Sequence, residues 1–387
     1  MKKIAIYLIF VFVALLVGGM NWLVLAELRS DSALPSSIPP PSAEMIFINK
    51  QMAGMTLRQK VASLLILHTP GSDITTLQNY LQTYQPGGLI FMGDNIPAVT
   101  DDLTTITSQL QTNPALPYLF AIDAEGGVVN RLPSDDTYSA AADLKSQPAS
   151  STESAFHDRS VLLKQLGINL NFGIVADVTD DPNSFIFQRV FGGEPTVVGE
   201  KVAAAVTGSI GLTLSTLKHF PGHGETVSDS HTSVPATDVS YEKWQQNDKP
   251  PFEQGVKAGA EVVMFGHLIY SSVDSLPASL STKWHQILSE QIGFTGVSIT
   301  DDMIMLQQSG DSKYSDPITN AISALQAGNM MLLFVLDHGG GESDIDPNSL
   351  IDGIVAAVEN GSLDRTIINI NVRQALSLRH SLPTILK

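Results

Sequence analysis

Short apolar runs alternate with longer amphipathic stretches from residue 46 to residue 387. Eight of these runs predict strands: Leu64–Leu67, Gly88–Met92, Tyr118–Ile122, Leu170–Val175, Thr216–Phe220, Val262–Phe265, Gly296–Thr300 and Met331–Val335. The stretches between them, such as Ile318–Ala327, have the apolar periodicity of helices. Strands that alternate with helices pair in parallel, and eight such units can close into a (β/α)8 barrel of the TIM type. We predict this α/β barrel as one domain, with a doubly wound open sheet as the alternative.

Local signals mark the ends of several helices. Thr56 and Gln59 have the spacing of a capping box, which predicts that the first helix of the barrel begins there. After the last predicted strand, two further helical patterns cover Ser349–Asn360 and Leu363–Arg379. No linker-like composition interrupts residues 46–387, so we assign them to one domain although their length would allow two.

The N-terminal residues have a different character. Lys2 and Lys3 precede an uncharged apolar run from Ile4 to Ala26. As a helix this run would reach about 34 Å, enough to cross the hydrocarbon core of a bilayer. A cleavable signal peptide is the alternative, because the run ends in a sequence that could serve as a cleavage site. We therefore assign residues 1–29 to a transmembrane anchor or a signal peptide.

A tether separates this segment from the predicted barrel. Residues 30–45 are rich in proline and serine, so we expect an extended linker that does not pack. The positive-inside rule keeps the two lysines in the cytoplasm and places residues 46–387 on the outer side. The predicted location is the cell membrane, held by a single N-terminal span, or outside the cell after secretion.

Composition excludes several kinds of chemistry. The chain has 22 basic and 39 acidic residues, a net charge of −17, which argues against a nucleic-acid partner because phosphate binding needs a basic surface. The absence of cysteine excludes disulfides, thiol nucleophiles, iron–sulfur clusters and thiolate zinc sites. The hydrophobic fraction of 43% is enough for a large core.

Polar residues gather at the ends of five successive predicted strands, from the third to the seventh. They are Asp123, Asp177, Lys218, His219, His267, Asp301 and Asp302. The carboxyl ends of parallel strands meet on one face of a barrel, where the active sites of such enzymes lie. We therefore predict a functional site on this face.

The segment KHFPGHGETVSDSH, Lys218–His231, is the most informative motif. Its proline and glycines exclude a regular helix, so we expect a loop at the rim of the barrel. His219 and His223 have the spacing of a metal-binding pair, but that spacing converges on one ion only within a helix. The carboxylate of Asp229 can instead hold one ring nitrogen of His231 and favour the protonated ring, which suits proton transfer. A solvated polar loop is the alternative.

Two more motifs place carboxylates at strand ends. In AIDAEGGVVNR, Asp123 is suited to accept hydrogen bonds from sugar hydroxyls, with ordinary turn chemistry as the alternative. In GVSITDDM, one of Asp301 and Asp302 could act as a nucleophile, or the pair could bind a cation. Alternation along a strand puts these two side chains on opposite faces, so we expect only one of them in the pocket.

Together these motifs resemble the β-N-acetylhexosaminidases of glycoside hydrolase family 3. The segments MTLRQKVASLLIL, PGGLIFMGDNI and NLNFGIVADV, the last followed by QRVFG, are also similar to the family's strands and loops. The resemblance covers residues 55–327 in order. Many β-glucosidases of this family carry a second domain with a glutamic acid as proton donor. The chain ends before such a domain, so we expect the single-domain hexosaminidase branch.

The resemblance implies a role for each matching residue. Asp301 takes the position of the nucleophile, His231 that of the general acid/base, and Asp229 that of its partner. Five residues take positions that hold sugar hydroxyls: Asp123, Arg131, Arg189, Lys218 and His219. Ala124 stands where the family usually has a larger polar residue, and Val190 stands where it often has a serine. Neither departure removes a predicted functional group, so we interpret both as adjustments of the site and not as its loss.

We therefore expect an exo-acting, retaining glycoside hydrolase that removes terminal β-linked N-acetylglucosamine through a covalent glycosyl-aspartate intermediate. The expected partner is a glycan, either a peptidoglycan fragment of the cell wall or a chitin oligosaccharide. We expect no cofactor, no metal, no nucleic acid, membrane contact only through the N-terminal segment, and a monomer. The alternatives are a family member with another sugar preference, a glycoside phosphorylase, and a carbohydrate-binding relic without turnover.

Overall fold

The computed structural model describes residues 41–113, 115–132, 138–228, 230, 233–336 and 345–382. The chain divides after Ile46, and the barrel lies entirely in the second part, which starts at Phe47. Helix α2 (Ala43–Gly54) begins within the segment for which we predicted a tether. Within the described ranges, no helix is both long and apolar enough to cross a membrane. The predicted anchor, Ile4–Ala26, lies outside the described residues.

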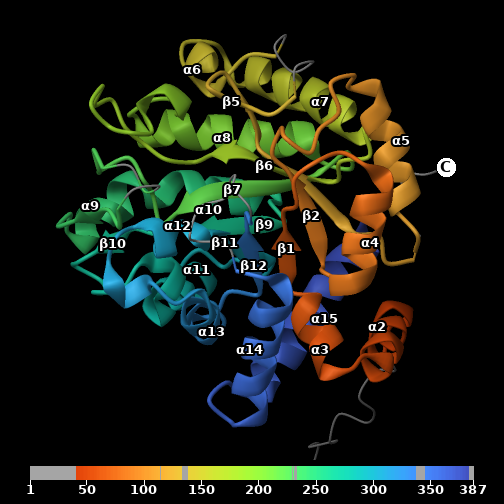
Figure 1. Ribbon diagram of the computed structural model, residues 1–387. Helices are drawn as coiled ribbons and strands as arrows, with labels where there is room; N and C mark the ends of the chain where they lie inside the picture. Colours follow the sequence, from red (N-terminus) through yellow and green to blue (C-terminus); the bar gives the residue numbers. More distant parts are fainter. Residues whose placement is uncertain are drawn as a thin grey trace, which may run out of the picture. The chain divides into compact units, whose positions relative to one another are not determined.

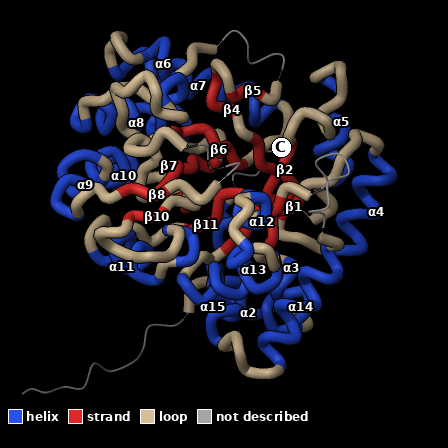
Figure 2. The backbone as a smooth tube through the Cα atoms, turned by 60° about the vertical axis from the view of Figure 1, so that its left-hand side comes forward, coloured by secondary structure: helices blue, strands red, loops and turns tan. Residues whose placement is uncertain are grey.

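Eight parallel strands form a closed barrel, as predicted, which excludes the open sheet. They are β1 (Leu65–Leu67), β2 (Gly88–Phe91), β3 (Leu119–Ile122), β6 (Leu170–Val175), β7 (Leu214–Phe220), β9 (Val262–Phe265), β11 (Val297–Asp302) and β12 (Met331–Phe334). Each pairs with its neighbours in chain order, and β12 closes the barrel on β1. Figures 1 and 2 show these strands at the centre of a ring of helices. All eight predicted strands are confirmed.

Helices follow most of the strands and cover the barrel. Those that pack against the barrel strands are α3 (Leu57–Ala62), α4 (Ile74–Tyr84), α5 (Asp101–Leu110), α7 (Ala149–Gln165), α8 (Pro195–Ser209), α10 (Lys249–Ala258), α11 (Thr282–Glu290), α13 (Pro317–Ala327), α14 (Pro347–Glu359) and α15 (Arg365–Ser381). Short elements in the loops are α6 (Ala141–Leu144), α9 (Tyr241–Asn247), α12 (Ile304–Gln308) and two strand pairs, β4 (Ala124–Gly126) with β5 (Val129–Asn130) and β8 (Ala236–Thr237) with β10 (Ile269–Tyr270).

The predicted helix signals act as expected. The Thr56 hydroxyl accepts from the amide of Gln59, and the Gln59 side chain accepts from the amide of Thr56, so the capping box opens α3. The two predicted C-terminal helices are α14 and α15. Their confirmation shows that local patterning was sufficient for these elements.

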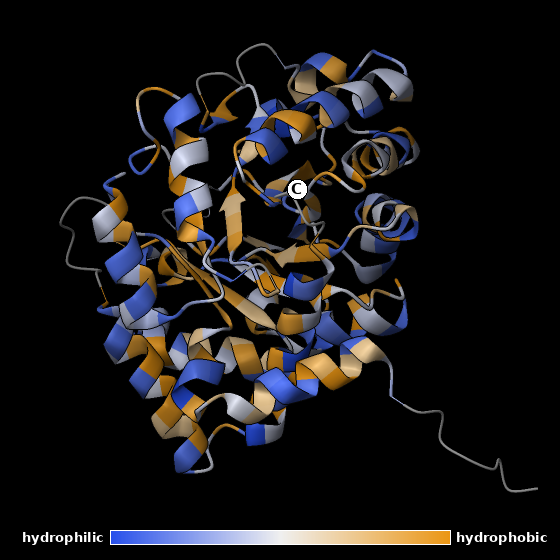
Figure 3. Cartoon of the chain, turned by 90° about the vertical axis from the view of Figure 1, so that its right-hand side faces the viewer, coloured by the Kyte–Doolittle hydropathy of each residue, from blue (hydrophilic) through white to orange (hydrophobic). Residues whose placement is uncertain are grey.

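The barrel core consists of apolar strands packed against the inner faces of the helices. In Figure 3 the strands are mostly hydrophobic, whereas the surrounding helices carry hydrophilic residues on part of their surface. One buried cluster joins β1, β11 and β12 to α13, α14 and α15, and a second joins β6, β7 and β9 to α8, α10 and α11. Strands packed in this way hold the loops at their carboxyl ends in fixed positions.

Candidate active site

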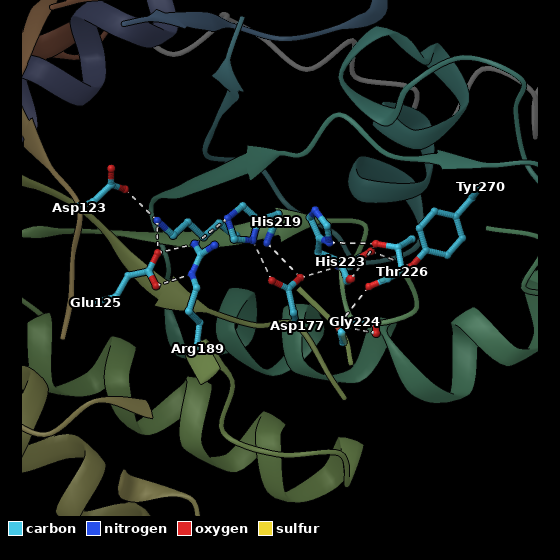
Figure 4. A network of polar contacts seen from close by, with 12 residues as sticks. Asp123, Glu125, Asp177, Arg189, His219, His223, Gly224, Thr226 and Tyr270 are labelled. Carbon is cyan, nitrogen blue, oxygen red and sulfur yellow. Dashed lines mark hydrogen bonds and ion pairs between the residues drawn. The ribbon is translucent and has the colours of Figure 1, made fainter. Parts of the chain in front are cut away.

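The polar side chains predicted for the strand ends meet on one face of the barrel. Asp123 follows β3, Asp177 follows β6, and Lys218 lies near the end of β7. The Nζ atom of Lys218 lies 2.8 Å from Oδ1 of Asp123, although 95 residues separate them in the chain. Figure 4 shows the resulting row of polar side chains, which runs from Asp123 to Tyr270.

Glu125, in β4, lies next to Asp123 at one end of this row. Arg189 binds it with two nitrogens: Nε lies 2.8 Å from Oε2, and Nη2 lies 2.6 Å from Oε1. The Nζ atom of Lys218 lies 2.5 Å from the same Oε1. The side chains of Glu125 and Lys218 are only 4% and 3% exposed. The network therefore joins three charged groups that are largely removed from solvent.

These charges stabilise one another. Burial alone would raise the pKa of Glu125, but the positive charges of Lys218 and Arg189 lower it to about 2. Burial alone would lower the pKa of Lys218, but Asp123 and Glu125 raise it above its usual value. Glu125 and Lys218 are therefore both ionised at neutral pH, which gives the site fixed charges before any ligand arrives.

The turn after Glu125 explains why two glycines follow it. Gly126 has a φ of 82°, in the left-handed region that favours glycine. A Cβ atom on Gly126 would also lie 2.5 Å from Nη2 of the buried Arg159. The turn can therefore pack tightly, and Glu125 can point back towards the end of β7.

His219 is held by protein groups at both ring nitrogens. Nδ1 lies 2.7 Å from Oδ2 of Asp177, and Nε2 lies 3.1 Å from Nη2 of Arg189. Because the guanidinium only donates, Nε2 accepts and the proton resides on Nδ1. Burial, assisted by the positive charge of Arg189, lowers the pKa of His219 well below its usual value, in agreement with a neutral ring.

Asp177 also fixes the first residues of the following loop. Its Oδ1 accepts from the backbone amides of His219 at 3.2 Å and His223 at 2.8 Å. The His223 ring packs beside His219 with its Nδ1 3.1 Å from the hydroxyl of Thr226, and its buried Nε2 has no hydrogen-bond partner among the described residues. The completely buried carboxylate of Asp177 therefore orders both the end of β7 and the loop that follows it.

Two aromatic side chains hold the base of this loop from the other side. The indole N–H of Trp244 donates to the carbonyl of Pro221 at 2.9 Å, and the hydroxyl of Tyr270 donates to the carbonyl of Gly222 at 2.7 Å. Both aromatic residues are completely buried. The backbone at residues 221–222 is therefore fixed from α9 and β10, two elements that follow it in the chain.

Asp301 and Asp302 differ in what they contact, as the alternation along β11 predicts. The carboxylate of Asp302 accepts hydrogen bonds from the backbone amides of Ile304 and Val335, so it fixes the backbone around the end of β11. Asp301 lies close enough to Lys218 and His219 for their electrostatic effects to reach it. The structure thus places Asp301 with the other polar groups of the site.

The surroundings of Asp301 favour its ionised form. Burial would raise the pKa of its carboxyl, but His219, His267 and Lys218 together lower the pKa below 3.8. At neutral pH the charge comes from Lys218, because burial keeps the pKa of both histidines low. Asp301 is therefore a carboxylate at neutral pH.

Of the three remaining predicted site residues, the structure describes one. Arg131 lies at the edge of the network, with Nη2 3.8 Å from Oδ2 of Asp123, and its side chain is 35% exposed. Asp229 and His231, the predicted proton-transfer pair, lie outside the described residues. Their predicted roles therefore stay predictions.

Sequence reasoning missed the central role of Glu125. A carboxylate beside two glycines is typical of a turn, and its partners lie far away in the chain. The available signal was its position two residues after Asp123, at the same strand end. For a metal site, no group of three or more histidine or acidic residues in the described ranges is arranged to hold an ion.

The chain is similar in sequence to known proteins. Residues 56–378 match the family model described as the glycosyl hydrolase family 3 N terminal domain. Beta-hexosaminidase of Nitrosomonas eutropha is 32% identical over 288 residues, which cover 70% of this chain and 80% of the relative. Beta-hexosaminidase A of Pseudoalteromonas piscicida is 31% identical over 280 residues, which cover 65% of this chain but only 46% of that longer relative.

A solved structure shows the same architecture. The glycoside hydrolase family 3 beta-N-acetylglucosaminidase of a Paenibacillus species superposes with a TM-score of 0.77 and 28% sequence identity. The superposition covers 85% of this chain and 63% of that protein, so the similarity concerns the barrel.

Proposed function

The chain belongs to glycosyl hydrolase family 3, and from this premise we propose that it is a β-N-acetylhexosaminidase. The substrate would be a glycan with a terminal β-linked N-acetylglucosamine. The observation that carries the proposal is the ionised Asp301 at the end of β11, within electrostatic reach of Lys218, which is itself paired with Glu125 and Asp123. A carboxylate nucleophile within a set of hydrogen-bonding side chains is what a retaining glycosidase needs.

The proposed reaction has two steps. In the first, a carboxylate oxygen of Asp301 attacks C1 of the sugar, and the bond from C1 to the leaving oxygen breaks while protonated His231 gives that oxygen its proton. In the second, neutral His231 takes a proton from water, which attacks C1 and releases Asp301 from the ester. Asp229 would orient the ring of His231 and stabilise its protonated form.

The described contacts suggest how the sugar would be held. Two of the three N–H hydrogens of Lys218 can be used by Asp123 and Glu125, which leaves the third for a sugar hydroxyl. Asp123 and Arg131 lie at the more exposed edge of the network, where a hydroxyl can reach both. His219 already has partners at both ring nitrogens, so a sugar contact at Nε2 would replace its contact with Arg189.

The natural substrate follows from the predicted location. If the segment Ile4–Ala26 directs the barrel to the outer side of the membrane, the enzyme meets peptidoglycan fragments or chitin oligosaccharides. We propose these glycans as its substrates. Turnover of a panel that contains wall fragments and chitobiose would distinguish them.

An aryl glycoside tests the proposed activity. The wild-type protein should release nitrophenol from nitrophenyl N-acetyl-β-glucosaminide, and Asp301→Asn should lose about 1,000-fold or more of kcat because the nucleophile is gone. Asp302→Asn is the matched control, since its amide oxygen can still accept from the amides of Ile304 and Val335. It should keep most of the activity. If the wild type releases no nitrophenol, the proposed activity is wrong. If Asp301→Asn keeps full turnover, the assignment of Asp301 as the nucleophile is wrong.

A further inference from the structure

The carboxylate of Asp301 is held by the peptide group of its neighbour. The backbone amide of Asp302 donates to Oδ1 of Asp301 at 2.8 Å. The orientation of the Asp301 carboxylate therefore depends on how firmly the peptide of Asp302 is held. A nucleophile gains rate from such fixation because a misplacement of about 1 Å can cost about 100-fold in rate.

Asp302 is anchored through its side chain. Its Oδ1 accepts from the amide of Ile304 at 3.1 Å and from the amide of Val335 at 2.9 Å. These two bonds connect the end of β11 to the start of α12 and to the residue after β12. The pairing of β11 with β12 shifts register between Ile299 and Asp302, and irregularities of this kind re-aim side chains at a barrel rim.

A third anchor reaches Asp302 from the neighbouring strand on the other side. Nε2 of His267, which follows β9, lies 2.9 Å from the carbonyl oxygen of Asp302. The carbonyl can only accept, so Nε2 carries the proton. The other ring nitrogen, Nδ1, lies 2.7 Å from the hydroxyl of Ser279. Both His267 and Ser279 are almost completely buried.

Ser279 is itself fixed in place. Its carbonyl accepts from the side-chain amide of the buried Asn329 at 2.6 Å, and its backbone amide donates to the carbonyl of Gly266 at 3.2 Å. Burial lowers the pKa of His267, so the neutral ring accepts the Ser279 hydroxyl proton at Nδ1. This hydrogen bond selects the tautomer that donates to Asp302.

We propose that His267 is a positioning residue for the nucleophile. It acts through the peptide of Asp302: Ser279 orients the ring, the ring holds the Asp302 carbonyl, and the Asp302 amide holds the Asp301 carboxylate. The proposal rests on the function proposed above, in which Asp301 attacks the sugar. His267 itself contacts neither the sugar nor the leaving group in this scheme.

The expected signature is a loss of attack rate at constant sugar binding. In His267→Ala, kcat/KM for nitrophenyl N-acetyl-β-glucosaminide should fall about 100-fold. It should fall by the same factor for the dinitrophenyl glycoside, whose leaving group needs no proton. Loss of a proton donor would instead spare the dinitrophenyl substrate. The inhibition constant of free N-acetylglucosamine should change less than about threefold, because the sugar-binding groups are untouched.

Conservative and matched variants separate positioning from simple destabilisation. In His267→Gln an amide N–H can still donate to the Asp302 carbonyl, so this variant should recover at least about tenfold of the loss. His285 is the control. Its ring stacks on Phe265 of β9, the strand that His267 follows, and its Nδ1 contacts the carbonyl of Ser281 and not that of Asp302. His285→Ala should unfold more easily and yet keep the wild-type kcat/KM per folded molecule.

The outcomes distinguish this proposal from the proposed function. If the wild type is inactive, the function fails. If the wild type is active and folded His267→Ala keeps its kcat/KM, or loses activity only towards the nitrophenyl glycoside, the positioning role is wrong. If His267→Ala does not fold, Ser279→Ala replaces it and should lower kcat/KM for both glycosides about threefold to tenfold. Wild-type values in Ser279→Ala would equally overturn the proposal.

Discussion

At the scale of single residues, the site depends on buried charges that compensate one another. Glu125 accepts from Arg189 and Lys218, and Lys218 also reaches Asp123. Each of these charges would be costly to bury alone, so the removal of one destabilises the others. This interdependence explains why a residue that does not need to touch substrate can be essential to the site.

Glu125→Gln is expected to destabilise the fold, because it leaves Lys218 and Arg189 with less compensation in a buried environment. The free energy of unfolding at pH 7 should fall by about 3 kcal/mol or more. Glu253→Gln, which removes an exposed carboxylate 3.6 Å from Lys249, is the matched control and should cost at most about 0.5 kcal/mol. Urea denaturation of the three proteins measures both values, and equal losses in the two variants would contradict the role of Glu125.

The same residue predicts a pH dependence. The pKa of Glu125 is about 2 in the folded state against 4.5 as reference, so folding favours its ionised form. The stabilisation is fully present above about pH 4.5 and is lost as the pH falls towards 2, and it amounts to about 3 kcal/mol. Between pH 4.5 and 2, the stability of the wild type should therefore fall more steeply than that of Glu125→Gln. Parallel curves would show that Glu125 titrates normally.

At the scale of elements, loops are shaped by groups that lie far from them in the chain. The base of the loop after β7 is held by Trp244 of α9 and Tyr270 of β10, and by Asp177 after β6. The sequence of the loop, with its proline and glycines, excludes regular structure but does not choose one conformation. These buried donors and acceptors make that choice.

Tyr270→Phe tests the support of this loop. The variant leaves the carbonyl of Gly222 without its buried donor, which should lower the free energy of unfolding by about 1–3 kcal/mol and should also lower kcat/KM. Tyr241→Phe removes a hydroxyl that donates to Gln291 at an exposed position, so it should change stability by at most about 0.5 kcal/mol. Denaturant unfolding and aryl glycoside turnover measure the two effects. Full activity in Tyr270→Phe would show that the loop base needs no such anchor.

At the scale of the whole barrel, closure brings the first and last segments together. Strand β12 pairs with β1, and the C-terminal helix α15 packs into the same core cluster. Arg379 in α15 donates from Nε to the carbonyl of Pro117 at 2.8 Å and from Nη2 to that of Leu116 at 2.9 Å. Helix α15 therefore donates hydrogen bonds to the backbone carbonyls just before β3, although it follows β12 in the chain.

Arg379→Met should reveal how much this tie contributes. The buried carbonyl of Leu116 and the partly buried carbonyl of Pro117 lose their donor, so we expect a loss of about 2–3 kcal/mol in the free energy of unfolding. Arg373→Met, in the same helix, removes an exposed contact with Asn49 and should cost about 0.5 kcal/mol or less. Neither variant should change kcat/KM per folded molecule. Thermal and urea unfolding provide the comparison, and equal stability of the two variants would contradict the role of Arg379.

The local part of this structure was predictable from the sequence. The eight strands and the helices α3, α13, α14 and α15 follow from apolar periodicity and caps, which are properties of neighbouring residues. The assembly of polar residues at the carboxyl ends was also predictable, because a parallel barrel allows only one such face. The roles of Asp229 and His231 stay predictions that mutation can test.

Contacts between distant residues were decided only by the tertiary structure. Glu125 contacts Arg189, which lies 64 residues away in the chain, and Asp302 contacts His267, which lies 35 residues away. Alternation along β11 separates Asp301 from Asp302, but only the irregular pairing with β12 and the amides that bind Asp302 settle which one faces the site. The amino-acid sequence determines what each segment can form, since periodicity acts over a few residues. Which buried group compensates which charge depends on closure of the barrel, because only closure brings those groups within hydrogen-bonding distance.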